Sequence, residues 1–156
     1  MHFYFLQKDY EALEKKIKAK RKEFKNLSQE VEDGCDQTSE TWHDNFAFEE
    51  AARMQKMIMS ELEKLYELRN YAILVKKTDR PANEVSIGKK VKIQNNQTGD
   101  IKEYLVGSYM VLNKTDKNEV SYKAPLLQKI TGLHPQETTE VEIRGKKITY
   151  TILEIS

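Results

Sequence analysis

Two stretches of the chain repeat their apolar residues at alternating steps of three and four, which is the pattern of helices that pack along a seam. The first covers residues 3–31 and has one polar member: Phe3, Leu6, Tyr10, Leu13, Ile17, Lys20, Phe24, Leu27 and Val31. The second covers residues 48–72 and has two polar members: Phe48, Ala51, Gln55, Ile58, Leu62, Leu65, Arg69 and Ala72. Neither stretch contains proline. We therefore expect two amphipathic helices that bury their apolar stripes against each other as an antiparallel coiled-coil hairpin.

The turn of this hairpin, at about residues 34–47, falls in the most acidic part of the chain. Residues 31–50 hold seven acids and no Lys or Arg, whereas residues 11–30 hold seven basic side chains and four acids; the net charge of the whole chain is only +1. A charge run is usually a solvated face, and that plain interpretation stands beside a functional one. The end of a hairpin has no core to bury, however, and helix capping accounts for only one or two acids. Folding alone therefore does not explain the acidic cluster, or Trp42 and Phe46 within it.

After a linker expected at residues 76–83, the apolar residues no longer follow helical spacing and instead alternate with polar residues. The stretches VSIGKKVKIQ, EYLVGSYMVLN and NEVSYK predict strands, and TEVEIRGKKITYTILEIS predicts two more around Arg144 and Gly145. In APLLQKITGL, Pro125 suits the start of a short helix and Gly132 suits its end. The predicted fold class is α+β. The coiled-coil hairpin is expected over residues 1–75, and a small antiparallel sheet domain with one short helix over residues 84–156.

Several features argue for a protein that stays in the cytoplasm. The chain has no run of 18 apolar residues, and its first ten residues lack the form of a signal peptide. The single cysteine, Cys35, cannot form an internal disulfide. Three histidines, His2, His43 and His134, lie far apart without zinc-binding spacing. We expect no membrane contact and no cofactor of the chain's own. Because a hairpin satisfies its own seam, we also expect a monomer, whereas a plain coiled-coil interaction module would associate.

The order of these motifs resembles the bacterial Gre transcript-cleavage factors along nearly the whole chain. In the C-terminal half, VSIGKKVKI, YLVG, SYKAPLLQKITG and VEIRGKKITYTILEI are similar in order and spacing to the FKBP-like domain of that family. At the hairpin turn the family pattern is G-D-L-x-E-N-A-E-Y, which aligns with residues 40–48, ETWHDNFAF. The second acid of the pattern is matched by Asp44, while the first falls on Thr41, next to Glu40.

The resemblance implies a transcription elongation factor whose partner is RNA polymerase. In that family the hairpin enters the secondary channel, and carboxylates at its tip hold the second Mg²⁺ of the polymerase active site, which then cleaves the 3′ end of backtracked nascent RNA. Hard oxygen ligands suit Mg²⁺ in such a two-metal reaction. Asp44 and Glu40 are the expected metal ligands and catalytic groups, and the chain itself would be no enzyme. Basic residues of the rod are expected to contact RNA or the channel: Lys18, Arg21, Lys22 and Lys25. Four residues are expected to bind the polymerase: Trp42, Ala124, Pro125 and Leu126.

Two other functions remain open at this stage. Because Thr41 is no anionic ligand, the chain is alternatively a regulator that occupies the channel and modulates or inhibits transcription without cleavage. FKBP-like domains also include prolyl isomerases, whose chemistry needs an apolar, aromatic-lined pocket. The aromatic residues available for such a pocket are Tyr104, Tyr109, Tyr122 and Tyr150, and their alternating positions are those of ordinary sheet packing.

Overall fold

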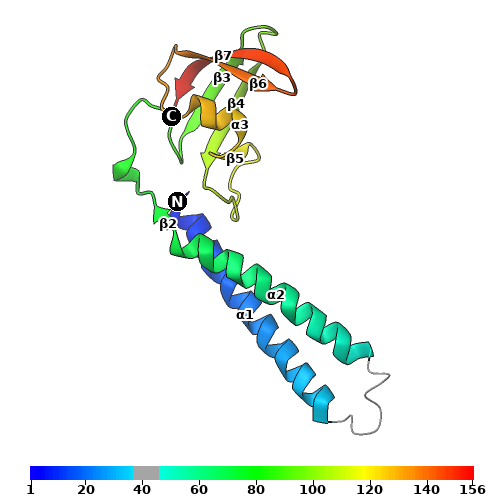
Figure 1. Cartoon of the computed structure of the whole chain (residues 1–156). Helices are drawn as coiled ribbons and strands as arrows, with labels where there is room; N and C mark the ends of the chain where they lie inside the picture. Colours follow the sequence, from blue (N-terminus) through cyan, green and yellow to red (C-terminus); the bar gives the residue numbers. More distant parts are fainter. Residues whose placement is uncertain (37–45) are drawn as a thin grey trace. The chain divides into compact units, whose positions relative to one another are not determined.

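The computed structural model describes residues 1–36 and 46–156, and these form two compact units. One unit is Glu11–Tyr71, and it contains most of the two long helices α1 (Gln7–Asp36) and α2 (Phe46–Asn70). The other unit combines Met1–Tyr10 with Ala72–Ser156 and contains the strands, shown in Figure 1. The predicted α+β class is therefore confirmed. No helix of the described residues is long and apolar enough to span a membrane.

The two helices form the antiparallel hairpin that the repeats predict. Three side-chain pairs join them: Ser28 with Gln55, Lys20 with Glu61, and Glu14 with Arg69. The partner's number on α2 rises as the number on α1 falls, so the helices run in opposite directions. The middle of the seam is buried at Leu13, Ile17, Ala51, Ile58, Leu62 and Leu65, whereas Phe24 and Leu27 are half-buried. Burial of this stripe is what stabilises two helices whose other faces are highly charged.

Each polar member of the seams has a partner on the opposite helix. The Gln55 side chain donates a hydrogen bond of 2.8 Å to Ser28 Oγ, whose own hydroxyl donates to the Phe24 carbonyl. Lys20 Nζ lies 2.8 Å from Glu61 Oε2. Arg69 lies 4.0 Å from Glu14 and over the Tyr66 ring, 4.9 Å from its centroid. The polar interruptions of the pattern are thus matched across the hairpin and do not break it.

The start of the chain differs from the prediction. Phe3–Phe5 is a strand, β1, that pairs in parallel with β2 (Ala72–Leu74), and α1 begins only at Gln7. Phe5 is fully buried and Phe3 nearly so, and the Phe3 ring lies 4.4 Å from that of Tyr109. A spacing of three between two apolar residues can arise by chance outside a helix. The helix predicted from residue 3 therefore began too early in the sequence. Residues 1–10 belong to the unit of the sheet, and the predicted boundary of the hairpin at residues 1 and 75 is wrong at both ends.

The sheet unit is built around five strands in the order β5-β4-β3-β7-β6. Their bounds are β3 (Lys90–Asn95), β4 (Ile101–Gly107), β5 (Glu119–Ser121), β6 (Thr138–Ile143) and β7 (Lys146–Ile155). All neighbours are antiparallel except β4 and β5, which are parallel, a departure from the predicted antiparallel sheet. The strand predicted from Val85 begins only at Lys90. Apolar residues of the strands and of α3 form one core: Val85, Val91, Ile93, Val106, Leu127, Ile130 and Ile152.

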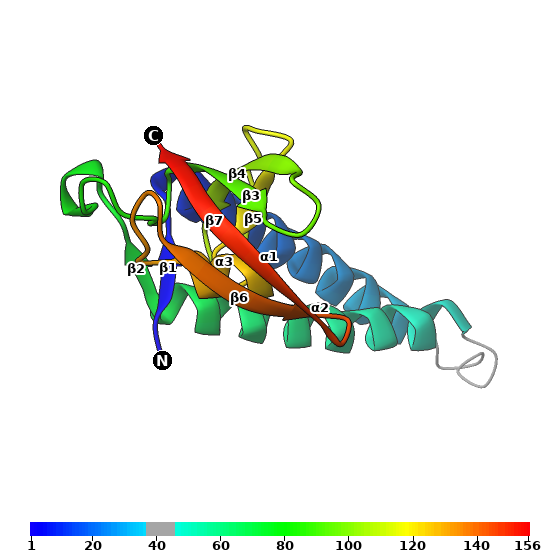
Figure 2. The same cartoon turned by 90° about the horizontal axis from the view of Figure 1, so that it is seen from above.

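Proline and glycine residues predicted the positions of two short elements correctly. Helix α3 (Pro125–Ile130) has Pro125 in its first turn and Gly132, with φ of 88°, just beyond its end. The β6–β7 hairpin, seen from above in Figure 2, turns at Arg144 and Gly145, both with positive φ. Within the expected linker the chain forms a short 3₁₀ helix, η2 (Lys77–Asp79).

Candidate functional site

A basic face runs along helix α1. Lys18, Arg21, Lys22 and Lys25 are all exposed, and their steps of three and four place them on one side of the helix. None of the four takes part in an ion pair in the part of the chain that the structure describes. The structure therefore brings the predicted RNA and channel contacts together on one surface.

Lys20 lies among these residues but has a different role. Its ammonium group bonds Glu61 at 2.8 Å and Glu23 at 3.3 Å. The hydrogen bond to Glu61 raises the pKa of Lys20, and the same bond lowers the pKa of the Glu61 carboxyl. Lys20 therefore joins the two helices and is not part of the basic face.

The acidic end of the hairpin is described only in its flanking turns. Glu32 and Asp33 are exposed near the end of α1, and Glu49 is exposed in the first turn of α2. Glu50 accepts a hydrogen bond of 2.6 Å from Arg53, which raises the pKa of that guanidinium. The predicted metal ligands Glu40 and Asp44 and the predicted contact Trp42 lie outside the described residues.

The third predicted surface lies at the start of α3. Pro125 is exposed, whereas Ala124 and Leu126 are half-buried against the core of the sheet unit. Pro125 also lines a groove of about 430 Å³ between α3 and β6. Polar side chains complete the groove: Gln128, Lys129, Glu140, Glu142 and Lys147. This surface offers one exposed apolar residue inside a polar rim, which is a common arrangement for a protein contact.

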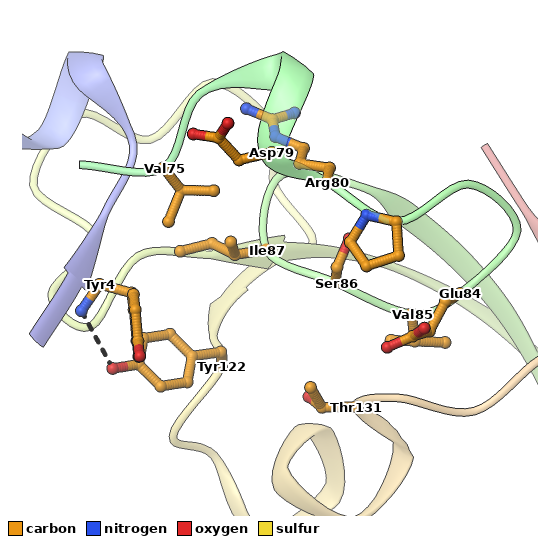
Figure 3. Close-up of a pocket in the computed structure, with 11 residues that line it drawn as sticks. Tyr4, Val75, Asp79, Arg80, Glu84, Val85, Ser86, Ile87, Tyr122 and Thr131 are labelled. Atoms are coloured by element: carbon orange, nitrogen blue, oxygen red, sulfur yellow. Dashed lines mark hydrogen bonds between the residues drawn. The ribbon is translucent and has the colours of Figure 1, made fainter. Parts of the chain in front are cut away.

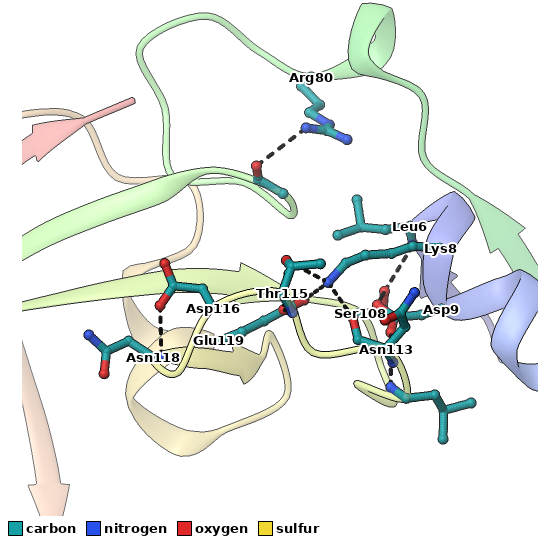
Figure 4. Close-up of polar contacts among 12 residues, drawn as sticks. Leu6, Lys8, Asp9, Arg80, Ser108, Asn113, Thr115, Asp116, Asn118 and Glu119 are labelled. Atoms are coloured by element: carbon teal, nitrogen blue, oxygen red, sulfur yellow. Dashed lines mark hydrogen bonds and ion pairs between the residues drawn. The ribbon is translucent and has the colours of Figure 1, made fainter.

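A buried polar network, not predicted from the sequence, ties the first turn of α1 to the loop before β5 (Figure 4). Asp9 is fully buried and accepts three hydrogen bonds: from Ser108 Oγ at 2.6 Å and from the backbone N–H groups of Leu112 at 2.9 Å and Asn113 at 2.8 Å. Beside it, Lys8 Nζ lies 2.5 Å from the buried carboxylate of Glu119. These contacts span about a hundred residues, so local sequence pattern gave no signal of them.

The four tyrosines considered for an isomerase pocket pack within the sheet unit. Tyr104, Tyr122 and Tyr150 contact the core, and Tyr109 contacts Phe3. The Tyr122 hydroxyl accepts a hydrogen bond of 3.2 Å from the Tyr4 backbone, and burial raises the pKa of this phenol. Among the described residues no group of three or more His, Cys, Asp or Glu could hold a metal ion.

These features define a class of protein: a helical hairpin with a basic face and acidic flanking turns, in one chain with a small α+β sheet unit. Residues 80–156 match the family model for the C-terminal domain of transcription elongation factors GreA and GreB. Residues 80–156 therefore form a C-terminal domain of the Gre family of transcription elongation factors, which supports the resemblance that the motifs indicated.

Sequence alignments with similar proteins extend over most of the chain. GreA of Mesomycoplasma hyopneumoniae strain 7448 is 28% identical over 130 residues, which are 83% of this chain and 78% of that protein. GreA of Amoebophilus asiaticus strain 5a2 is 28% identical over 113 residues, or 72% of this chain and 71% of the relative.

The solved structures to which the chain is similar include GreA factor homolog 1 (Gfh1) of Thermus thermophilus, with a TM-score of 0.46 and 15% identity, covering 100% of this chain and 99% of the other. A GreA/GreB factor from Nitrosomonas europaea has a TM-score of 0.42 and 14% identity, covering 100% of this chain and 98% of that chain.

Proposed function

We propose that this protein binds RNA polymerase in the cytoplasm, inserts its helical hairpin into the secondary channel and stimulates cleavage of backtracked RNA. The observation that carries the proposal is the joint presence of the GreA/GreB C-terminal domain at residues 80–156 and an antiparallel hairpin at Glu11–Tyr71. The chain works as a monomer and is not itself an enzyme. It completes the nuclease site of the polymerase at the 3′ end of the nascent RNA.

The carboxylates of Asp44 and Glu40 are the groups that would act in the reaction. Both belong to the segment that connects α1 and α2. Carboxylate oxygens are the ligands that Mg²⁺ prefers, and one or two of them, together with waters, are enough to hold the second metal of the polymerase site. That metal stabilises the attacking and leaving oxygens during hydrolysis. Trp42 in the same segment would contact the polymerase.

The described surfaces have roles that follow from their chemistry. The basic face of Lys18, Arg21, Lys22 and Lys25 would lie against RNA or acidic walls of the channel, an attraction that salt weakens. The surface at Ala124, Pro125 and Leu126 would bind the outside of the polymerase, where the exposed Pro125 enters an apolar site of the partner.

A second candidate function is favoured by Thr41. This residue stands where the family pattern has the first of its two tip acids, and a hydroxyl is no anionic ligand for Mg²⁺. A tip with a single matched acid would occupy the channel without completing the metal site. The protein would then slow or inhibit nucleotide addition.

Cleavage of RNA in a stalled, backtracked elongation complex separates the two functions. The purified chain is added at low and moderate Mg²⁺, alongside Asp44→Ala, Glu40→Ala and, as a matched control, Glu32→Ala, which removes an exposed acid from α1. Faster cleavage that Asp44→Ala abolishes and Glu32→Ala preserves supports the metal-ligand role. Binding without cleavage, together with slower nucleotide addition, would establish the channel-occupying regulator. Absence of binding to the polymerase would overturn both.

A further inference from the structure

The sheet unit contains a cavity that the proposed transcription function does not use. Its volume is about 300 Å³, at the lower end of the range of ligand sites. Figure 3 shows side chains from the linker, from the segment before β3 and from the ends of β5 and α3 around it. Apolar groups of Val75, Val85 and Ile87 line the cavity together with the rings of Tyr4 and Tyr122.

Two buried polar atoms belong to residues that line this cavity. Arg80 Nε and Ser86 Oγ are both buried and have no hydrogen-bond partner among the described residues. A buried polar group without a partner destabilises the fold, so such groups point to a ligand or to another polar group that completes them. Arg80 Nε is a donor, whereas the Ser86 hydroxyl can donate or accept. Arg80 Nε can therefore donate to a backbone carbonyl of a ligand, and Ser86 Oγ can accept from a backbone N–H.

The backbone around Gly88 positions the Arg80 side chain. Its Nη1 donates a hydrogen bond of 3.3 Å to the Gly88 carbonyl, drawn in Figure 4. Gly88 has φ of 83°, and a Cβ atom there would come within 2.5 Å of Arg80 Nη1. Lys89 Nζ also donates to the Pro81 carbonyl, which fastens the linker to the start of β3. The hydrogen bond to the Gly88 carbonyl and the absence of a Cβ at Gly88 therefore position the Arg80 guanidinium.

The charges at the cavity favour a basic occupant. Asp79 and Glu84 contribute two carboxylates and Arg80 one cation, so the three charged residues that line the cavity sum to −1. Asp79 is exposed and Glu84 half-buried, so both carboxylates remain accessible to a long cationic side chain. An anionic ligand would meet net repulsion, and a purely apolar one would leave Arg80 Nε and Ser86 Oγ without partners.

We propose that this cavity binds an extended peptide segment of a partner protein in which an apolar residue is followed by Lys or Arg. The apolar side chain packs against Val85 and Ile87. A backbone carbonyl of the segment accepts from Arg80 Nε, and a backbone N–H of the segment donates to Ser86 Oγ. The carboxylates of Asp79 and Glu84 attract the basic side chain that follows. None of the residues that line the cavity belongs to the hairpin unit Glu11–Tyr71, so binding of the peptide can be measured without polymerase or RNA.

Peptide titration of the full chain tests the proposal by NMR. The probe is the acetylated and amidated tetrapeptide Ala-Leu-Lys-Ala, added to the ¹⁵N-labelled protein. We expect saturable shifts at the amides of Ser86, Ile87, Tyr122 and Thr131. Two control peptides, Ala-Leu-Glu-Ala and Ala-Ala-Lys-Ala, reverse the charge or remove the apolar group, and each should bind at least about 5-fold more weakly. Equal binding of the three peptides, or no saturable shift at these amides, would overturn the proposal.

Matched variants test the roles of individual side chains. Ser86→Ala should weaken binding of the Leu-Lys peptide about 3- to 10-fold, while Ser156→Ala, which removes an exposed hydroxyl outside the cavity, should leave it unchanged. The double variant Asp79→Asn and Glu84→Gln should weaken binding and reduce its dependence on salt, whereas Glu142→Gln on β6 should not. These near-isosteric changes test the site even if Ser86→Ala does not fold. Saturation of the cavity by indole but not by the peptide would identify a small-molecule site and contradict the proposal.

Discussion

At the scale of single residues, Asp9 shows how a polar side chain can organise a fold. Its two carboxylate oxygens accept hydrogen bonds from one hydroxyl and two backbone N–H groups, with no part of the residue exposed. Asp9→Ala leaves the buried Ser108 hydroxyl and two partly buried backbone N–H groups without an acceptor, so we expect the free energy of unfolding to fall by about 3 kcal/mol. Urea denaturation followed by circular dichroism measures the change. Lys15→Ala, an exposed substitution on the same helix, is the control, and a comparable loss in both variants would refute this role of Asp9.

The ion pair between Lys20 and Glu61 gives the hairpin a specific dependence on pH. Because the hydrogen bond to Lys20 lowers the pKa of Glu61 below its ordinary value of 4.5, the folded state favours the ionised carboxyl. This contribution is present above that value and is lost as the pH falls through the lower pKa of the folded state. For Lys20, whose pKa is raised above 10.5, the contribution is present below 10.5 and is lost as the pH rises through the folded value.

Glu61→Gln should therefore make the melting temperature depend less on pH in the acid range. Melting temperatures measured by circular dichroism between pH 6 and pH 3 should fall less steeply than in the unmodified protein. The effect is small because the pair is exposed to solvent. Glu63→Gln changes the charge equally at an exposed position of α2. If the control reduces the pH dependence of the melting temperature by the same amount, overall charge is responsible and the pair with Lys20 is not.

At the scale of elements, the helices of the hairpin depend on one apolar stripe. Leu62 is 7% exposed in the seam, whereas Met57, on the same helix, is 56% exposed. Leu62→Ala should lower the free energy of unfolding by about 3 kcal/mol, because it removes buried methyl groups and leaves a cavity. Met57→Ala should change it by less than about 0.5 kcal/mol. Both values come from urea denaturation of the full chain. If the two substitutions cost the same, the buried stripe is not what holds the hairpin together.

The elements also show what sequence pattern can and cannot predict. The heptad repeat from Tyr10 onward and the turn residues Pro125 and Gly145 specify local conformations, and each was placed correctly. Phe3 and Leu6 continue the same spacing, yet Phe3 lies in β1, because its partners Ala72 and Tyr109 are distant in the sequence. The parallel pairing of β4 with β5 likewise depends on a long connection that no local pattern encodes. The basic face of Lys18, Arg21, Lys22 and Lys25 was predictable from spacing alone, whereas the cavity at Arg80 required tertiary structure.

At the scale of the whole molecule, the proposed function requires the basic face of the hairpin to contribute to binding. Replacing Lys18, Arg21, Lys22 and Lys25 by Ala removes four exposed positive charges from that face. We expect the affinity for the elongation complex to fall about 10-fold at ~0.1 M salt, because each exposed charge contributes a few tenths of a kcal/mol. The slope of the logarithm of affinity against the logarithm of salt concentration should also decrease.

The matched control for this prediction removes the same charge from the sheet unit. Lys76, Lys77, Lys117 and Lys146 are exposed there, and their replacement by Ala lowers the net charge by the same amount. Fluorescence anisotropy of the labelled protein with purified elongation complex gives the affinities at several salt concentrations. A large loss for the α1 variant and a small one for the control locates the attraction on the hairpin. Equal losses would mean that only net charge matters. Because net charge carries no information about which part of the chain enters the polymerase, that result would remove the basic face from the mechanism.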